Sequence, residues 1–241
     1  MRYLAGVVNL VLGTLVLAVF GTLYVILLLL YRCLGISPSR LHRLEVWFAR
    51  AVAAGFGQKL EIRPPAHSVT APAAKKIYLM VPHTSFLDVF VTAAALPEYA
   101  TGVGAKNYFR WPVIGWLLSL RMKPIDRNNH YDAIGTLNRV AEEAFAQGIA
   151  LVIAPEGTRT FGDKMMEFKK GAFCVAFATG AEVIPVVITG ARLSWPRGKL
   201  FPKRGFVMVK FLPPVTKNGF VNVSNMAALV YDKVEAELNH H

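Results

Sequence analysis

The stretch "IYLMVPHTSFLDVF", residues 77–90, joins a short apolar run to a polar turn and then to a second apolar run. Residues 77–81 form a continuous apolar run of the length that is typical of a buried strand. Pro82 favours an extended exit from that strand. The second run, residues 88–96, has the pattern of a helix. The stretch therefore predicts a strand, a polar turn and a helix in direct succession.

The same alternation continues along the rest of the chain. Further strand-like runs occupy residues 122–125, 149–154, 183–189 and 206–212. Further helix-like stretches occupy residues 111–120, 132–147, 169–179 and 223–238. Alternating strands and helices predict an α/β fold, a mostly parallel mixed sheet flanked by helices. With 241 residues, we expect one catalytic α/β domain over residues 58–241 and N-terminal membrane-embedded helices over residues 1–57.

The N-terminal part is the most apolar. Residues 3–31 contain no charged side chain, and as a helix they would extend about 44 Å, against roughly 30 Å of bilayer hydrocarbon. This run is longer than the apolar part of a cleavable signal peptide, about 7–15 residues, so we expect it to be retained. It either spans the bilayer or lies in one leaflet against a second helix, residues 39–56. Both alternatives predict a hydrophobic two-helix membrane segment.

The chain is strongly basic. Its 27 Lys and Arg against 15 Asp and Glu give a net charge of +12, which favours anionic partners. Because the N-terminus is apolar, membrane lipids are the expected partner; no basic stripe with interleaved aromatic residues indicates nucleic acid. One arginine precedes the apolar run and four follow it: Arg2, then Arg32, Arg40, Arg43 and Arg50. The positive-inside rule then predicts that the catalytic domain lies on the cytoplasmic face.

His83 and Asp88 lie five residues apart around the turn. Asp88 can reach back to a ring nitrogen of His83, fix its tautomer and leave the other nitrogen free as a general base. Thr84 or Ser85 is placed to cap the following helix. The alternative is a buried His–Asp pair that only caps that helix, and the residues alone leave both interpretations open.

A second polar cluster, "APEGTRT" at residues 154–160, follows the most apolar strand. In sheets of this kind, ligands bind beyond the carboxyl ends of the strands. Glu156, Gly157, Thr158 and Arg159 supply a flexible turn, a hydroxyl and a guanidinium, and arginine suits bidentate binding of phosphate. The alternative is an ordinary turn with a surface ion pair.

Basic residues near other strand ends form a third, dispersed cluster. Lys106 lies in "AKNYFRWPVIG", and Asp126 and Arg127 follow the strand at residues 122–125. Lys169 and Lys170 lie at the start of a predicted helix, where the helix dipole favours an anion. Taken singly, each is a solvated surface charge; together they predict convergence on one phosphate.

Taken in order, these blocks resemble those of a known enzyme family. "HTSFLD", "AKNYFRWPVIG", "MKPIDR", "APEGTRT", "FKKGAF" and "VIPVVI" are similar in order and spacing to the 1-acylglycerol-3-phosphate acyltransferases, a family of glycerolipid acyltransferases, over residues 77–189. The resemblance implies transfer of an acyl group from acyl-CoA or acyl carrier protein to the sn-2 hydroxyl of lysophosphatidic acid. The product, phosphatidic acid, belongs to phospholipid biosynthesis.

The resemblance also implies roles for individual residues. In the family the histidine of the His-x-x-x-x-Asp block is the base and the aspartate is its partner, here His83 and Asp88. The Glu-Gly-Thr-Arg block and the basic residues of the middle blocks hold the acceptor's phosphate, here Lys106, Arg127, Glu156, Gly157, Thr158 and Arg159. Two positions depart from the common pattern, Pro82 for Asn and Ala154 for Phe, and they leave the acceptor less defined.

No metal or resident cofactor is expected, because the donor thioester is itself a substrate. The two cysteines, Cys33 and Cys174, have neither disulfide nor metal-ligand spacing. We expect direct transfer with His83 as base, the alternative being a covalent intermediate on Ser85. Other acceptors remain open: another lysophospholipid, glycerol-3-phosphate or a glycolipid. A thioesterase lacks support without a Gly-x-Ser-x-Gly turn, and a non-catalytic membrane phospholipid-binding protein is the other alternative.

Overall fold

The computed structural model describes residues 2–64, 75–126, 129–160 and 165–240. Within those residues seven strands form one sheet in the order β1-β7-β6-β2-β5-β3-β4. The strands are β1 (Gln58–Arg63), β2 (Lys76–Val81), β3 (Ala100–Ala105), β4 (Met122–Ile125), β5 (Ala150–Ile153), β6 (Glu182–Thr189) and β7 (Gly205–Phe211). Neighbours are parallel except β6 and β7, which are antiparallel. The mostly parallel mixed sheet is therefore confirmed.

Two of these strands, β1 and β3, have no counterpart among the predicted elements. The sequence of β3, "ATGVGA", contains two glycines, which weaken a strand pattern. A Cβ on Gly102 would lie 2.9 Å from the carbonyl oxygen of Val152 on the neighbouring strand β5. The close contact between the two backbones thus requires glycine at this position. Strand propensities of single residues do not include such contacts, so the strand was not predicted.

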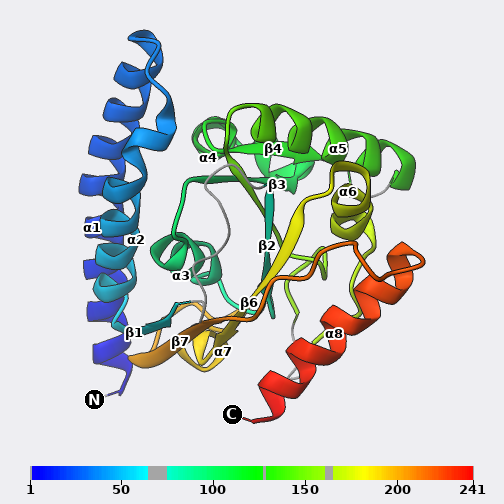
Figure 1. The fold of residues 1–241 in the computed structure, drawn as a ribbon. Helices are drawn as coiled ribbons and strands as arrows, with labels where there is room; N and C mark the ends of the chain where they lie inside the picture. Colours follow the sequence, from blue (N-terminus) through cyan, green and yellow to red (C-terminus); the bar gives the residue numbers. More distant parts are fainter. Residues whose placement is uncertain (1, 65–74, 127–128, 161–164, 241) are drawn as a thin grey trace.

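Helices cover both faces of the sheet (Figure 1). They are α1 (Arg2–Cys33), α2 (His42–Gly55), α3 (Asp88–Ala95), α4 (Pro112–Ser119), α5 (His130–Ala146), α6 (Gly171–Thr179), α7 (Ala191–Ser194) and α8 (Val223–Asn239), with short 3₁₀ helices η1 (Pro38–Leu41) and η2 (Lys106–Arg110). One core packs α5, α6 and α8 on the sheet. The other packs α2 and α3 on the opposite face.

The N-terminal segment differs in part from the expectation. Among the described residues, α1 is the one helix long and apolar enough to cross a bilayer, and most of its surface is exposed. The second helix, α2, is amphipathic and packs between α1 and α3 (Figure 1). A Cβ on Gly13 would collide with the Phe56 ring, so α1 and the end of α2 approach closely. The pair is one apolar helix and one amphipathic helix, because α2 must also cover the sheet.

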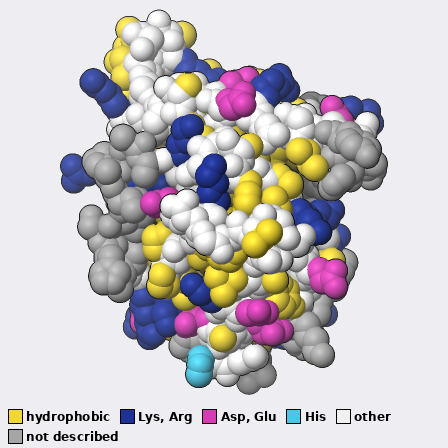
Figure 2. Space-filling view, turned by 45° about the vertical axis from the view of Figure 1, so that its right-hand side comes forward, with side chains coloured by type: hydrophobic (Ala, Val, Ile, Leu, Met, Phe, Trp, Pro, Cys, Tyr) yellow, Lys and Arg dark blue, Asp and Glu magenta, His cyan; other side chains and the backbone are white. Residues whose placement is uncertain are grey.

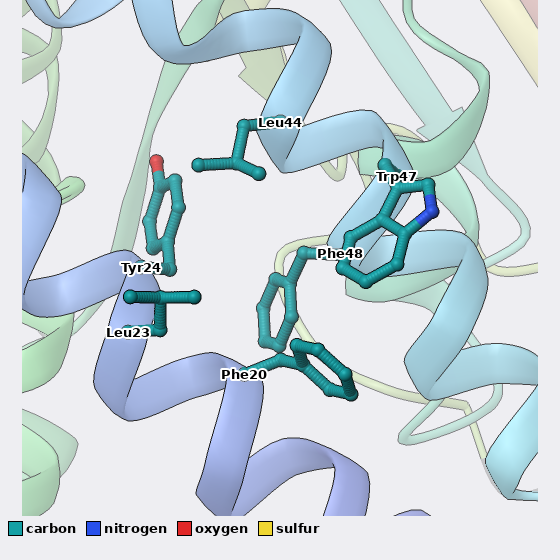
Figure 3. A pocket seen from close by; sticks show the side chains of 6 residues that line it. All are labelled: Phe20, Leu23, Tyr24, Leu44, Trp47 and Phe48. Carbon is teal, nitrogen blue, oxygen red and sulfur yellow. The ribbon is translucent and has the colours of Figure 1, made fainter.

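Aromatic side chains fill the contact between α1 and α2. A small hollow there is lined by Phe20, Leu23, Tyr24, Leu44, Trp47 and Phe48 (Figure 3). The Phe20 and Trp47 rings meet edge to face with centroids 5.0 Å apart, and the Tyr24 and Phe48 rings stack at 5.8 Å. Such pairs add to the stabilisation from burial alone. The two helices are therefore held as one unit.

A partly buried cation joins this helical pair to the sheet. The Arg121 guanidinium donates through Nη2 to the Glu45 carboxylate on α2 and to the carbonyl oxygen of Ala100 at 3.0 Å. It also lies 3.9 Å from the centre of the Tyr99 ring, and burial raises the pKa of the Tyr99 phenol. Charge pairing, a hydrogen bond and a cation–π contact thus offset part of the cost of desolvating this cation, whose Nη1 is buried without a hydrogen-bond partner.

Replacing Glu45 by Ala should lower the free energy of unfolding by about 3–5 kcal/mol, because it leaves Arg121 without its counter-charge in a largely desolvated site. Unfolding in detergent, followed by circular dichroism, measures the change. The matched control is Glu61→Ala, which breaks the exposed Glu61–Arg63 pair and should cost about 0–1 kcal/mol. Equal effects of the two changes would contradict this account of the Arg121 contact.

Candidate active site

His83 and Asp88 come together at the carboxyl end of β2. The strand ends at Val81, and Asp88 is the first residue of α3. The Nδ1 atom of His83 lies 2.9 Å from Oδ2 of Asp88. The Asp88 side chain is fully buried, whereas 17% of the His83 side chain is exposed. The carboxylate therefore fixes the ring through Nδ1 and leaves Nε2 as the nitrogen that can face a substrate.

The Asp88 carboxylate also organises the turn. Its Oδ2 atom accepts hydrogen bonds from the backbone N–H groups of Thr84 and Ser85, both at 2.7 Å. The expected cap from a Thr84 or Ser85 hydroxyl is wrong: the cap residue of α3 is Leu87, with no side-chain bond. The hydrogen bonds run the other way along the chain: a side chain of the helix, Asp88, accepts from backbone N–H groups of the preceding turn. Asp88 thus serves the turn and the histidine together.

Ser85 is placed poorly for nucleophilic attack. Its side chain is fully buried. Its hydroxyl donates to the carbonyl oxygen of Trp195 at 2.7 Å and accepts from the Leu87 N–H at 3.1 Å. A nucleophilic serine must instead present its hydroxyl to a base and to the substrate. The contacts of the Ser85 hydroxyl therefore do not favour a nucleophilic role for this residue.

Glu156 fastens the loop after β5 to the histidine. Its side chain is buried, and Oε1 accepts from the backbone N–H of His83 at 2.7 Å. Oε2 accepts from the Thr160 hydroxyl at 2.6 Å and from the Met166 N–H at 3.1 Å. In return, the Thr160 N–H donates to the His83 carbonyl oxygen at 2.8 Å. Since this carboxylate is buried among donors of the chain, its position suits alignment of His83 rather than contact with a phosphate.

Sequence reasoning missed the part played by Thr160. Thr160 ends the cluster "APEGTRT", and the pattern of that cluster assigns it no role. The signal was available, since a hydroxyl four residues after a carboxylate in a tight turn can bond to it. What the sequence did not supply is that the turn folds back on His83.

The other residues of that loop are more open. Gly157 has φ +71°, and a Cβ there would lie 2.8 Å from the Cδ and Cε atoms of Lys169. Glycine thus allows the left-handed turn and leaves room for the lysine side chain. Thr158 and Arg159 are partly exposed. The loop therefore brings the Lys169 cation, predicted at a helix start, next to Gly157.

The third cluster also lies at the carboxyl ends of the parallel strands. Lys106 begins η2 after β3, and its Nζ lies 3.7 Å from Oδ2 of Asp126 after β4. Tyr108 of η2 accepts a hydrogen bond from Nη2 of Arg159 at 3.4 Å, so η2 and the loop after β5 meet. Arg127 lies outside the described residues. Four parallel strands, β2, β5, β3 and β4, hence bring these polar segments to one edge.

No metal site is found among the described residues, and no basic stripe is seen on the face drawn in Figure 2. Within the described ranges, no three His, Cys, Asp or Glu side chains are grouped so that they could hold a metal ion. On the face drawn in Figure 2, Lys and Arg side chains are interspersed with acidic and apolar ones.

Comparison with known proteins identifies the family. A family model described as Acyltransferase matches residues 66–189. The 1-acyl-sn-glycerol-3-phosphate acyltransferase of Escherichia coli is 30% identical over 235 residues, which cover 95% of this chain and 89% of that protein. The chain belongs to the 1-acylglycerol-3-phosphate acyltransferase family. Its resemblance in sequence blocks is thereby confirmed.

Other family members match more narrowly. The enzyme of the same name from Cocos nucifera is 31% identical over 134 residues, 55% of this chain. The chain spans about half the length of the plant and yeast relatives that it matches, 44% to 62%. A solved structure titled as the 1-acyl-sn-glycerophosphate acyltransferase PlsC of Thermotoga maritima has a TM-score of 0.81 at 18% identity, and covers 100% of this chain and 97% of its own. That likeness establishes the same fold.

Replacing Thr160 by Val should lower the free energy of unfolding by about 1.5–3 kcal/mol, since it removes a hydrogen bond to the buried Glu156 carboxylate. Thr160→Ser, which keeps the hydroxyl, is the matched control and should stay close to the wild type. Chemical denaturation in detergent measures both variants. If Val and Ser behave alike, the hydroxyl does not hold Glu156.

Proposed function

We propose that the chain transfers an acyl group from a thioester to the sn-2 hydroxyl of lysophosphatidic acid and so forms phosphatidic acid. The observation that carries the proposal is the His83–Asp88 pair, with 2.9 Å between Nδ1 and Oδ2, beside the cationic residues of the same sheet edge. The names of the bacterial relatives, which this chain matches over most of their length, support the acceptor.

In this mechanism Nε2 of His83 accepts the proton of the acceptor hydroxyl while the oxygen attacks the thioester carbonyl. The tetrahedral intermediate collapses, the C–S bond breaks, and the departing thiolate takes up the proton held by His83. Asp88 stabilises the imidazolium that exists between these two steps. No acyl-enzyme is needed, in keeping with the buried hydroxyl of Ser85.

The acceptor's phosphate would be held by cations along the sheet edge. The role of Lys106 and Arg159 is supported by their proximity: Lys106 lies on η2, Arg159 lies on the loop after β5, and Arg159 donates a hydrogen bond to Tyr108 of η2. Arg127, Gly157 and Thr158 complete the predicted set. Glu156 acts in our proposal by aligning His83 through its backbone. Binding energy from the phosphate then positions the hydroxyl that reacts.

The N-terminal residues 1–57 would keep this site at a membrane. The apolar helix α1 exposes side chains along its length, among them Leu4, Leu15 and Leu30. Because α2 contacts both α1 and α3 and so binds part of α1 to the rest of the fold, we propose that the pair lies in one leaflet, with the active site on the cytoplasmic face. Acyl-CoA or acyl carrier protein would then reach the site from the aqueous side.

Replacing His83 by Ala should reduce acceptor-dependent thiol release from palmitoyl-CoA to background, and Asp88→Asn should lower kcat by about 10²–10⁴-fold. The assay follows free thiol in detergent with and without lysophosphatidic acid. Ser85→Ala is the matched control in the same turn and should keep its turnover.

Other outcomes of the same assay separate the alternatives. Thiol release that does not require an acceptor would indicate a thioesterase. Lipid binding without turnover for any donor would indicate a phospholipid-binding protein. An acyl group trapped on Ser85 would refute direct transfer.

Replacing Arg159 by Ala should raise KM for lysophosphatidic acid by about ten- to a hundredfold, the worth of one charge-assisted hydrogen bond. Monoacylglycerol, which lacks the phosphate, should show no such increase. Arg63→Ala, at an exposed arginine of β1, is the control. An equal loss with both acceptors would show that Arg159 does not read the phosphate.

A further inference from the structure

The segment from within α7 to the start of β7, residues 192–204, combines cations with exposed leucines; we name it the basic loop. It contains no acidic residue and five basic ones, Arg192, Arg197, Lys199, Lys203 and Arg204. Leu193 and Leu200 are 72% and 69% exposed. Large apolar side chains held in water among cations are typical of a surface that meets anionic lipid. None of the steps proposed above uses these side chains.

The basic loop has a defined conformation. The Lys203 N–H donates to the Ser194 carbonyl oxygen at 2.7 Å, and Nε1 of Trp195 donates to the Lys199 carbonyl oxygen at 2.9 Å. Gln58, at the start of β1, donates through Nε2 to the Lys203 carbonyl oxygen at 2.9 Å. These bonds fix the backbone between the two leucines. Their exposure is therefore built into the fold.

The basic loop also lies against the apolar helix. A Cβ on Gly6 of α1 would lie 3.2 Å from Cβ of Phe201, so the residue after Leu200 touches the first turns of α1. Figure 1 shows α7 and β7 at the same end of the molecule as the N-terminal end of α1. The exposed apolar surface of α1, which includes Leu4 at this end, thus continues toward the basic loop.

Cations lie at the other end of α1 as well. Arg40 and Arg43, around the turn into α2, are exposed. A helix of 32 residues is about 48 Å long, so the two basic groups flank a long apolar face. Basic groups at both ends favour a helix in the plane of the interface, because a spanning helix would place one of the two groups on the non-cytoplasmic side, against the positive-inside rule.

We propose that the basic loop is a second membrane contact, in which its cations bind anionic phospholipid headgroups and Leu193 and Leu200 enter the headgroup region. This inference rests on the proposed membrane association of α1. The contact would also orient the active site, since Trp195 packs on Phe86 with ring centroids 5.2 Å apart and Arg197 donates to the Arg159 carbonyl oxygen. The basic loop is thus joined to the turn that carries His83 and to the loop after β5.

Site-specific fluorescence tests the proposal on the full chain. In a Cys33→Ser, Cys174→Ser background, an environment-sensitive fluorophore is attached to Leu200→Cys, to Val19→Cys on α1, or to Val221→Cys. Val221, 89% exposed, precedes α8 and serves as the aqueous reference. The protein is reconstituted in vesicles of phosphatidylcholine, with or without phosphatidylglycerol, that carry nitroxide-labelled headgroups.

We expect quenching at positions 200 and 19 and none at position 221, with the quenching at 200 increased by phosphatidylglycerol. Lys199→Gln with Lys203→Gln should raise the phosphatidylglycerol concentration needed for half-maximal quenching by about fivefold per lysine. The control pair Lys217→Gln with Lys233→Gln, exposed on the far side of the sheet, should leave it unchanged.

Three results would overturn the inference. Quenching at 19 without quenching at 200 would refute the basic loop as a membrane contact while the association of α1 stands. No quenching at either position would refute the membrane association itself. If position 200 is not quenched by the vesicles but its fluorescence changes when acyl carrier protein is added to the same samples, the loop binds a protein donor and not lipid.

Discussion

The bond between the Glu156 carboxylate and the backbone N–H of His83 holds the site together. A carboxylate buried as deeply as Glu156 is stable only where donors replace its water. Those donors come from the His83 turn, from Thr160 and from Met166. These hydrogen bonds fix the segment after β2 against the segment after β5. Asp88 and Arg159, which lie on those two segments, are thereby held at fixed positions relative to each other.

Much of the fold follows from local pattern. The apolar runs that predicted β2, β5 and β6 are buried on both faces of the sheet and therefore read as continuous hydrophobic stretches. β3 was not predicted, because Gly102 is required by close contact with the backbone of β5 and not by an apolar pattern within the strand. β1 was not predicted, because its sequence "QKLEIR" mixes charged and apolar side chains, as an edge strand of a sheet can.

The site divides in the same way. The positions of His83 and Arg159 at strand ends could be predicted, because parallel strands bring their carboxyl ends to one end of the sheet. The direction in which each side chain points could not. Glu156 was expected to contact the ligand, but its side chain points inward and accepts a hydrogen bond from the His83 N–H. That N–H is brought near Glu156 only when the loop folds, so the sequence does not show it.

The Glu45–Arg121 contact bears on where the protein can be divided. Val52 and Phe56 are buried in the same core as Leu87 and Val91 of the catalytic domain, and Arg121 takes its counter-charge from α2. A fragment that began at residue 58 would expose that apolar face and leave Arg121 without its counter-charge. The N-terminal helices and the sheet thus share one core and one buried ion pair, and removing the residues before 58 would remove part of both.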